Sequence, residues 1–335
     1  MANTLAGEHY QIVVVGGGAG GIAVAASLLK RDRSLHIALI EPSEKHYYQA
    51  AFTLVGANAF DADETIRKEV DVLPSGVRWL KSAVIKLEPK NNTVLLDSGK
   101  SISYDYMVVC PGLVLDWQGI EGLEDTIGKN GVCSNYLLHY AEYTRECLAS
   151  INAGRVLFTQ PPMPIKCAGA PQKIMYLAAH NWEKHKSLHD FDIEFHTATP
   201  TLFGVAEFVP PLNKYIDRYD IELNLQSNLV AIDGPAKKAF FQQGENKVEV
   251  DFDVIHVVPP QRAPEFISSS PCADNSGWLA VDKYTLRSDK YTNVFGLGDV
   301  TNTPNAKTAA AVRKQVPVVC ENLLASVRGE ELDIM

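Results

Sequence analysis

Short apolar runs and amphipathic stretches alternate along the first third of the chain. Residues 11–15 and 35–40 are almost wholly apolar and rich in β-branched side chains, a pattern that predicts two buried parallel strands. The Ala-rich stretch at 22–30 lies between them and predicts a helix, so the three segments form a βαβ unit. A polar stretch predicts a further helix near 62–70, and apolar runs predict strands at 77–80, 84–87, 93–96 and 101–110.

The same alternation begins again in the second half of the chain. A helical pattern at 136–149 is followed by an apolar strand pattern at 155–159. The remaining elements are predicted as helices at 173–185, 212–219 and 308–326 and as strands at 193–197, 254–258 and 293–297. Because strand and helix alternate twice over, we predict an α/β fold with two Rossmann-like, doubly wound domains.

Length and charge narrow the class of protein. A chain of 335 residues is too long for one ordinary core, which supports two domains. The net charge of −9 argues against a nucleic-acid partner, because phosphate binding needs a basic face. No apolar run reaches the roughly 18 residues of a membrane span, and no secretory signal or transit peptide is visible. We therefore expect a location in the bacterial cytoplasm or at the periphery of the cytoplasmic membrane. The six cysteines form no C-x-x-C pair, so no metal site is predicted.

A Gly-rich turn follows the first predicted strand. Gly16, Gly18 and Gly21 match the G-x-G-x-x-G pattern between a strand and a helix, and Glu41 follows the second strand. In such a turn the first glycine permits the tight bend, the second lets the backbone approach a pyrophosphate, and the third allows the helix to pack closely on the strand. A carboxylate at the position of Glu41 can accept hydrogen bonds from a ribose diol. The alternative is an ordinary Gly-rich turn with a surface glutamate, but the four features together favour a dinucleotide site.

The far end of the chain indicates which dinucleotide binds. Residues 292–299 form a predicted strand ending in Gly-Asp, and this segment resembles the second flavin fingerprint of disulfide-reductase-like flavoproteins. The resemblance implies that Asp299 binds a ribitol hydroxyl and that a helix beginning at Lys307-Thr308 aims its positive end at the flavin. Pro111 and Gly112 resemble the same family's chain crossing between domains. Asp299 could instead cap a helix or stand in a turn, but three motifs in the expected order predict FAD.

The second α/β unit lacks the glycines of the first. Its strand at 155–159 is followed by a turn in which prolines and Cys167 stand instead. Proline has no N–H for a phosphate and cannot adopt a positive φ, so a nicotinamide dinucleotide is disfavoured here. Cys167 adjoins Lys166 and precedes a predicted helix, two features that favour a thiolate able to pass electrons to a flavin. The alternative is a small buried cysteine in a domain interface.

These motifs together predict two domains of the disulfide-reductase flavoprotein type. Residues 1–115 and 285–335 are expected to form a discontinuous FAD-binding domain, and residues 116–284 a second Rossmann-like domain that carries the redox cysteine.

The cysteine segment carries a more specific resemblance. Residues 164–177, Pro-Ile-Lys-Cys-Ala-Gly-Ala-Pro-Gln-Lys-Ile-Met-Tyr-Leu, resemble the first-cysteine segment of sulfide:quinone oxidoreductases. Other stretches between Tyr10 and Cys320 agree with the same family. The resemblance implies FAD-dependent oxidation of sulfide to sulfane sulfur, with Cys167 as a redox cysteine. Sulfide, a quinone as electron acceptor and a separate sulfur acceptor are then the expected partners.

The sequence departs from that family in one respect. The family's second redox cysteine lies in a Gly-Tyr-Thr-x-Cys-Pro-like segment after the helix at 308–326, followed by amphipathic helices that contact the membrane. Neither is found before Met335, and Cys272 and Cys320 do not match the missing cysteine. For Cys133 a buried thiol at a strand end is the favoured interpretation, and the alternative is a partner thiol, since some members of that family have a third cysteine near this position. We therefore expect either a shortened chain or a paralogue with altered chemistry, and contact with a membrane surface only where such a segment is present. The alternatives are a flavoprotein sulfide dehydrogenase, an NADH dehydrogenase or an FAD-binding scaffold without turnover, and each is compatible with a homo-oligomer.

Overall fold

The computed structural model describes residues 8–332, and the chain forms two compact units. Unit 1 comprises Met1–Tyr47, Arg67–Val114 and Arg262–Met335, and unit 2 comprises Tyr48–Ile66 and Leu115–Gln261.

Two segments cluster differently from the predicted domain boundaries at 115 and 285. Residues 262–284 cluster with unit 1, where Leu279 is fully buried in the main core. Residues 48–66 cluster with unit 2, where Phe52 is buried beside Ala141. Both segments bury apolar side chains against residues distant in sequence, and such contacts leave no signal in local periodicity.

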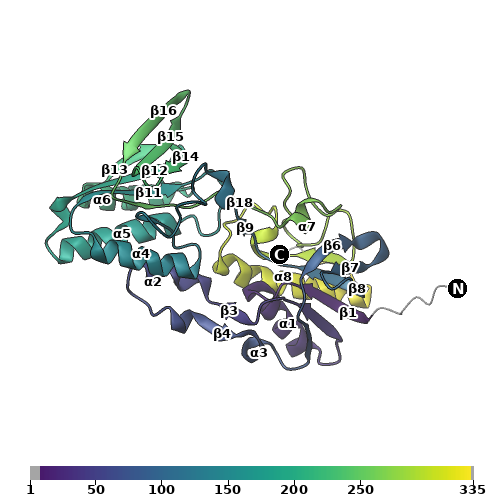
Figure 1. The fold of residues 1–335 in the computed structure, drawn as a ribbon. Helices are drawn as coiled ribbons and strands as arrows, with labels where there is room; N and C mark the ends of the chain where they lie inside the picture. Colours follow the sequence, from purple (N-terminus) through teal and green to yellow (C-terminus); the bar gives the residue numbers. More distant parts are fainter. Residues whose placement is uncertain (1–7, 333–335) are drawn as a thin grey trace. The chain divides into compact units, whose positions relative to one another are not determined.

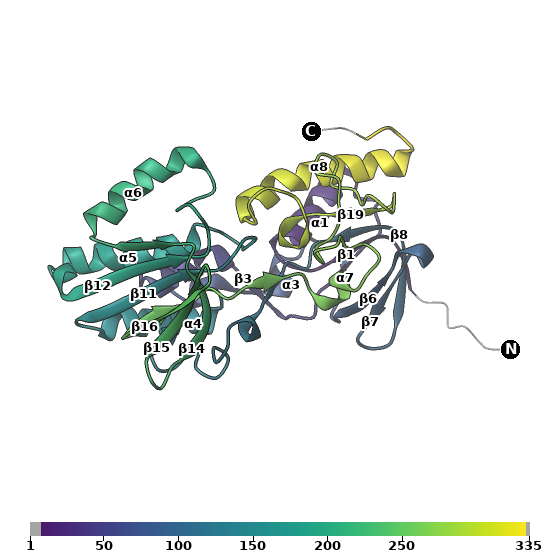
Figure 2. The ribbon, with the colours of Figure 1, turned by 90° about the horizontal axis from the view of Figure 1, so that it is seen from above.

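Unit 1 is built on one seven-stranded sheet with the order β5-β2-β1-β8-β7-β6, and β19 pairs with the C-terminal half of β8 (Figures 1 and 2). The strands are β1 (His9–Val15), β2 (Ile37–Ile40), β5 (Val77–Leu80), β6 (Val84–Glu88), β7 (Thr93–Leu96), β8 (Ser101–Val109) and β19 (Val294–Gly296). β7 pairs antiparallel with both β6 and β8, and the other pairings are parallel. Both faces of a parallel sheet are covered, which explains the continuous apolar runs of β1 and β2.

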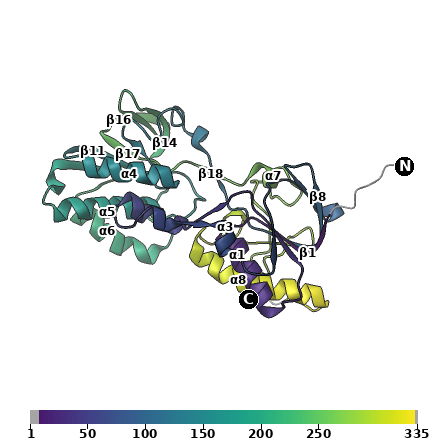
Figure 3. The ribbon, with the colours of Figure 1, turned by 60° about the horizontal axis from the view of Figure 1, so that its bottom comes forward.

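The parallel strands of unit 1 end in register. Val15 of β1 pairs with Ile40 of β2 on one side and with Val109 of β8 on the other, and Val109 also pairs with Gly296 of β19. The segments that follow these four strands therefore leave the sheet at the same edge. Helices α1 (Ala19–Arg31) and α8 (Ala309–Arg328) pack side by side in this unit (Figure 3).

Unit 2 is built on a five-stranded parallel sheet with the order β10-β17-β11-β12-β13. Its strands are β10 (Val132–Cys133), β11 (Gly154–Gln160), β12 (Phe191–Thr197), β13 (Glu222–Leu225) and β17 (Val254–His256). Its main helices are α4 (Leu138–Ser150), α5 (Ala170–Lys184) and α6 (Val209–Arg218). An antiparallel sheet adds β14 (Asn228–Asp233), β15 (Lys238–Gln243) and β16 (Asn246–Asp251).

The two faces of β11 belong to two different cores, because side chains alternate along a strand. Phe158 is buried with Ile174 of α5 and Leu148 of α4, whereas Leu157 is buried with Phe241 of the antiparallel sheet. The five-stranded sheet is therefore covered by helices on one face and by strands on the other.

The predicted α/β fold is confirmed, with parallel strands at the centre of both main sheets, and the long predicted strands and helices are present within a few residues of their expected ends. The helix expected near 62–70 is wrong, because this stretch forms a 3-10 turn (Asp63–Thr65), β4 (Ile66–Lys68) and the short helix α3 (Glu69–Val72). The remaining short elements are β3 (Lys45–Tyr47), β9 (Val114–Leu115), β18 (Gln261–Arg262), α2 (Phe52–Gly56) and α7 (Glu265–Ser268). Within residues 8–332, no helix combines the length and apolar character needed to cross a membrane.

Candidate functional site

The Gly-rich turn between β1 and α1 requires its glycines for different reasons. Gly16 has a φ of +105°, and a Cβ there would lie 2.6 Å from the carbonyl oxygen of Cys110. A Cβ on Gly21 would lie 1.9 Å from the carbonyl oxygen of Gly16, so only glycine allows α1 to pack this closely on the turn. At Gly18, in contrast, a Cβ would meet no protein atom within 4 Å. The turn is thus crowded by protein at two glycines and open at the third, where a ligand can approach the backbone.

Glu41 is fixed at the end of β2, next to this turn. Its Oε2 accepts a hydrogen bond from the Gly17 backbone N–H at 2.8 Å, and its Oε1 accepts one from the Ser43 N–H at 2.9 Å. Its carbonyl oxygen accepts a hydrogen bond from the Trp79 indole at 2.9 Å. Each carboxylate oxygen keeps a second lone pair, so Glu41 can still accept hydrogen bonds from a ribose diol.

Glu69 is a neighbour of Glu41 that the sequence did not point to. It begins α3 and is 1% exposed, and its Oε1 would touch a Cβ on Gly17 at 2.6 Å. No motif marks this residue, because a glutamate in a polar stretch reads as an exposed side chain.

The Gly-Asp turn at Asp299 leaves the same edge of the sheet. It follows β19 as the 3-10 turn Gly298–Val300, and β19 ends in register with β8. Pro111 and Gly112 follow β8, and Gly112 has a φ of +76° with no protein atom within 4 Å of a Cβ placed there. The structure therefore brings the Gly-rich turn, Glu41, the Pro-Gly segment and Asp299 to one edge of one unit.

Lys307 and Thr308 stabilise the backbone at this edge. The Lys307 ammonium is buried and donates hydrogen bonds to the carbonyl oxygens of Asp299 at 2.7 Å and Thr301 at 2.8 Å. It also lies 4.0 Å from the centre of the Trp278 ring. Burial lowers the pKa of Lys307 to about 8. Thr308 caps α8, because its hydroxyl oxygen accepts a hydrogen bond from the Ala311 N–H at 3.1 Å.

This edge of unit 1 suits FAD. The first turn of α1 contains no acidic residue that would compete with a phosphate for its free N–H groups. The open space above Gly18 leaves room for a pyrophosphate, and Glu41 is placed for a ribose. In such turns the second glycine approaches the pyrophosphate. Here that residue is Gly18, and no protein atom lies within 4 Å of a Cβ placed on it.

Cys167 lies in unit 2, in the turn between β11 and α5. Its side chain is half-buried, its φ is +50°, and its carbonyl oxygen accepts a hydrogen bond from the Ala170 N–H at 2.7 Å. The Lys173 ammonium, within the first turns of α5, lies 3.6 Å from the Cys167 sulfur. The sulfur therefore has both the positive end of a helix and a cation beside it.

The backbone next to Cys167 is held by two side chains of the same unit. Tyr136 donates a hydrogen bond from its hydroxyl to the Lys166 carbonyl oxygen at 3.1 Å, and the Lys166 N–H donates to Gln261 Oε1 at 2.6 Å. The Lys166 ammonium donates hydrogen bonds to Gln49 Oε1 at 2.6 Å and to the Tyr136 carbonyl oxygen at 3.3 Å. The sequence pointed to Lys166 as the cation beside Cys167, and the structure adds Lys173, whose ammonium lies 3.6 Å from the sulfur.

The other five cysteines are buried, and no disulfide links any of the six. Burial raises the pKa of Cys110 to about 12 and that of Cys272 and Cys320 to about 11, and it also raises that of Cys133. Because a thiolate is the reactive form of cysteine, these four thiols are poor nucleophiles. No group of three or more metal-binding side chains occurs in the part of the chain that the structure describes.

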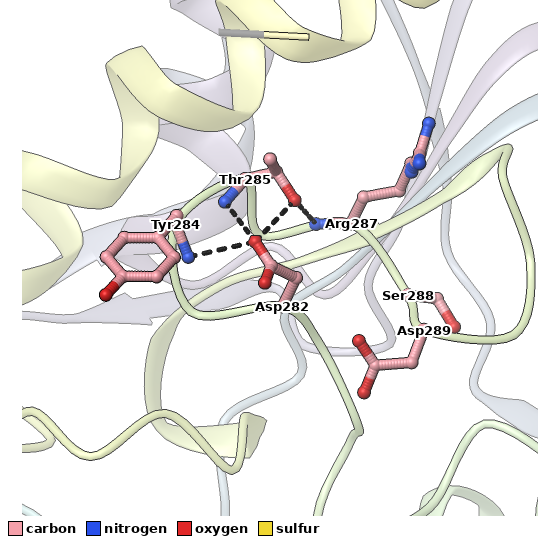
Figure 4. Close-up of a pocket in the computed structure, with 6 residues that line it drawn as sticks. All are labelled: Asp282, Tyr284, Thr285, Arg287, Ser288 and Asp289. Carbon is pink, nitrogen blue, oxygen red and sulfur yellow. Dashed lines mark hydrogen bonds between the residues drawn. The ribbon is translucent and has the colours of Figure 1, made fainter. Parts of the chain in front are cut away.

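A surface hollow in unit 1 lies in the turn after Val281, and its lining contains neither a glycine of the Gly-rich turn nor Glu41, Asp299 or Cys167. Figure 4 shows that Asp282 points into its own turn, where its Oδ1 accepts hydrogen bonds from the N–H groups of Tyr284 and Thr285 and from the Thr285 hydroxyl. Arg287, Ser288 and Asp289 complete the lining. These bonds explain Asp282 as a turn residue, so the hollow is not the candidate site.

Comparison with known proteins identifies relatives of this chain. Residues 10–146 match the pyridine nucleotide-disulphide oxidoreductase family. The mitochondrial sulfide:quinone oxidoreductase of Mus musculus is 42% identical over 327 residues, which are 96% of this chain and 72% of that protein. The mitochondrial sulfide:quinone oxidoreductase of Dictyostelium discoideum is 42% identical over 326 residues, with the same coverage of both chains.

The structural comparison agrees with the sequence comparison. The solved sulfide:quinone oxidoreductase of Aquifex aeolicus has a similar fold, with a TM-score of 0.83 at 22% identity over 96% of this chain and 77% of that one. The predicted flavoprotein fold and the family resemblance are therefore confirmed, and so is FAD, since sulfide:quinone oxidoreductases are FAD-dependent. The relatives are named as mitochondrial, whereas the expected bacterial location stays a prediction. On these grounds the chain belongs to the sulfide:quinone oxidoreductase family.

Proposed function

We propose that Cys167 is the sulfur-reactive residue of a sulfide oxidation in which electrons pass through FAD to a quinone. The supporting observation is the setting of its thiol. Of the six cysteines, all of which lie within residues 8–332, Cys167 is the one that is not buried. It stands at the N-terminus of the 15-residue helix α5, with the Lys173 ammonium 3.6 Å from its sulfur.

Lys173 and the N-terminus of α5 act on the sulfur electrostatically. Both favour a negative charge on the Cys167 sulfur, and the thiolate is the form of cysteine that attacks sulfur. The same charges attract anionic sulfide. Lys173 is itself exposed, so solvent screens its effect and its contribution is smaller than that of a buried pair.

The overall reaction balances as a two-electron transfer. The sulfur of sulfide loses two electrons and becomes sulfane sulfur, which leaves on a nucleophilic sulfur acceptor. The quinone gains two electrons and two protons and becomes a quinol. When bound, FAD supplies the two-electron carrier between them. Gly16, Gly18, Gly21 and Glu41 are proposed to hold its pyrophosphate and ribose, and Asp299 to bind its ribitol.

The test is sulfide-dependent reduction of a soluble quinone, normalised to bound FAD. We expect Cys167→Ser to abolish activity while FAD is retained, because a serine hydroxyl neither ionises near neutral pH nor forms a persulfide. Lys173→Gln should lower the rate, whereas Lys184→Gln, on the exposed C-terminal end of the same helix, should leave it unchanged. Full activity in Cys167→Ser would remove Cys167 from the reaction, and equal rates in the two lysine variants would remove Lys173.

A further inference from the structure

A second carboxyl group lies buried beside Glu41, under the Gly-rich turn of unit 1. The Glu69 side chain is 1% exposed. A Cβ on Gly17 would meet Glu69 Oε1 and Glu41 Cγ at 2.6 Å each, so both acidic side chains pack against the same residue of the turn. Glu41 is tied to that turn through the Gly17 N–H. Glu69 thus lies beside the residues that, on the proposed function, hold the ribose and the pyrophosphate.

Few neighbouring groups could stabilise a negative charge on the Glu69 carboxyl. Within the described residues, its Oε1 has no hydrogen-bond partner, and its Oε2 lies 3.5 Å from Nδ1 of His46 on β3. Glu41 and His46 are the titratable groups that face it, while Lys45 of β3 and Asp71 of α3 are exposed. Burial, and after it the negative charge of Glu41, raise the pKa of Glu69 to about 7. The group is a neutral acid below that pH, since a buried carboxylate with one oxygen left unpaired and a second negative charge nearby is costly.

We propose that Glu69 makes FAD binding depend on a proton: the chain holds FAD tightly while Glu69 is neutral and loses affinity when its carboxyl ionises. The negative charge of Glu41 already lies beside the turn, and the pyrophosphate is itself anionic. A second negative charge beneath Gly17 repels both. Because the group is buried, water and salt screen this repulsion poorly.

The direction of the pH dependence follows from linkage. FAD brings negative charge close to Glu69, which raises the pKa of its carboxyl further, so that binding above pH 7 takes up a proton. Below the pKa of Glu69 in the free protein, the carboxyl is protonated in both the free protein and the FAD complex. The Kd for FAD then does not depend on this group. Above it, we expect the Kd to rise by up to about tenfold per pH unit until the pKa of the complex is reached.

The experiment measures the Kd of the deflavinated full chain for FAD, by flavin fluorescence, between about pH 6 and pH 8.5. ADP is the second probe, because it contains the ribose and the pyrophosphate but not the flavin. For the wild-type chain, we expect the Kd of both ligands to rise above pH 7. Glu69→Gln keeps the size of the side chain and cannot ionise, so its profile should be flat. At pH 8 this variant should bind FAD up to about tenfold more tightly than the wild type.

Two further variants make the assignment specific. Glu69→Met is a second neutral side chain of similar length and should also flatten the profile, while His46→Gln should leave the rise in place. A rise that survives in both Glu69 variants, that disappears in His46→Gln, or that is seen with FAD but not with ADP would overturn the proposal. The outcome is independent of Cys167, whose replacement is tested by turnover and is expected to leave FAD bound.

Discussion

Alanine substitutions at Gly18, Gly20 and Gly21 are expected to have three different outcomes, although the residues lie within four positions of each other. The Gly21→Ala methyl group would lie 1.9 Å from the Gly16 carbonyl oxygen, so the backbone of the turn or of α1 must move by about 1 Å. We expect such overpacking to lower the free energy of unfolding by about 3 kcal/mol. The helix propensity of alanine offsets about 1 kcal/mol of this loss, which leaves a net loss of about 2 kcal/mol.

Gly18→Ala and Gly20→Ala test the ligand and the helix separately. At Gly18 the methyl group meets no protein atom and φ is −67°, so we expect only the loss of about 0.5–1 kcal/mol that alanine causes at an N-cap. The methyl group fills the space proposed for the pyrophosphate, and the Kd for FAD should rise at least about tenfold, or about 1.4 kcal/mol. Gly20→Ala is the matched control, because its methyl group meets the Cys110 Cβ at an ordinary 3.5 Å.

Urea unfolding of the three apoproteins and titration with FAD give both quantities for each variant. Gly20→Ala should keep the stability and the FAD affinity of the wild type, or gain stability. An FAD affinity of Gly18→Ala within twofold of the wild type would refute the placement of the pyrophosphate. A Gly21→Ala protein as stable as Gly20→Ala would refute the close packing of α1 on the turn.

Two other predictions follow from Lys307 and from the turn at Cys167. Lys307 has a pKa of about 8 in the folded chain, below the usual lysine value, so the unfolded chain binds more protons above pH 8 and the folded chain gains stability there. The wild type should therefore become more stable relative to Lys307→Met between pH 8 and 10, by at most about 1.4 kcal/mol per pH unit. A difference in the free energy of unfolding, measured in urea, that becomes smaller over this range would contradict this. NADH should reduce the flavin slowly in stopped-flow mixing, because Pro161 and Pro164 offer no N–H to its pyrophosphate, and rapid bleaching of the flavin band would contradict this.

The sequence predicted the sheet of unit 1 well because its central strands β1 and β2 are almost wholly buried and its outer strands are short runs of apolar and β-branched residues. Residues 77–80 and 93–96 form strands with the predicted bounds, and the glycine spacing identified the turn that follows β1. The antiparallel strands β14–β16 were not predicted. β16 alternates between exposed and half-buried positions, so it carries only a weak apolar signal.

The misassigned helix near 62–70 and the overlooked Glu69 have the same origin. This stretch is polar, and its conformation is set by residues distant in the chain. The Glu69 N–H donates a hydrogen bond to the Glu44 carbonyl oxygen, and the Glu69 carboxyl is covered by Gly17 and His46. Local periodicity contains none of these contacts, so a buried carboxyl was read as part of a solvated helix.

In each unit, one central parallel strand is followed by a turn and a helix, but the two turns offer different chemistry. In unit 1 the turn between β1 and α1 consists of glycines, which expose backbone N–H groups and leave open space at Gly18. In unit 2 the turn between β11 and α5 contains prolines and holds Cys167 at a φ of +50°. A helix N-terminus follows both turns, and its positive end favours whichever anion stands in front of it. The same feature of the fold can therefore stabilise a pyrophosphate in one unit and, as we propose, the thiolate of Cys167 in the other. Replacing glycines by prolines removes the phosphate site without removing the electrostatic advantage of the helix, which explains how one architecture can bind a dinucleotide once and leave its second turn free for sulfur chemistry.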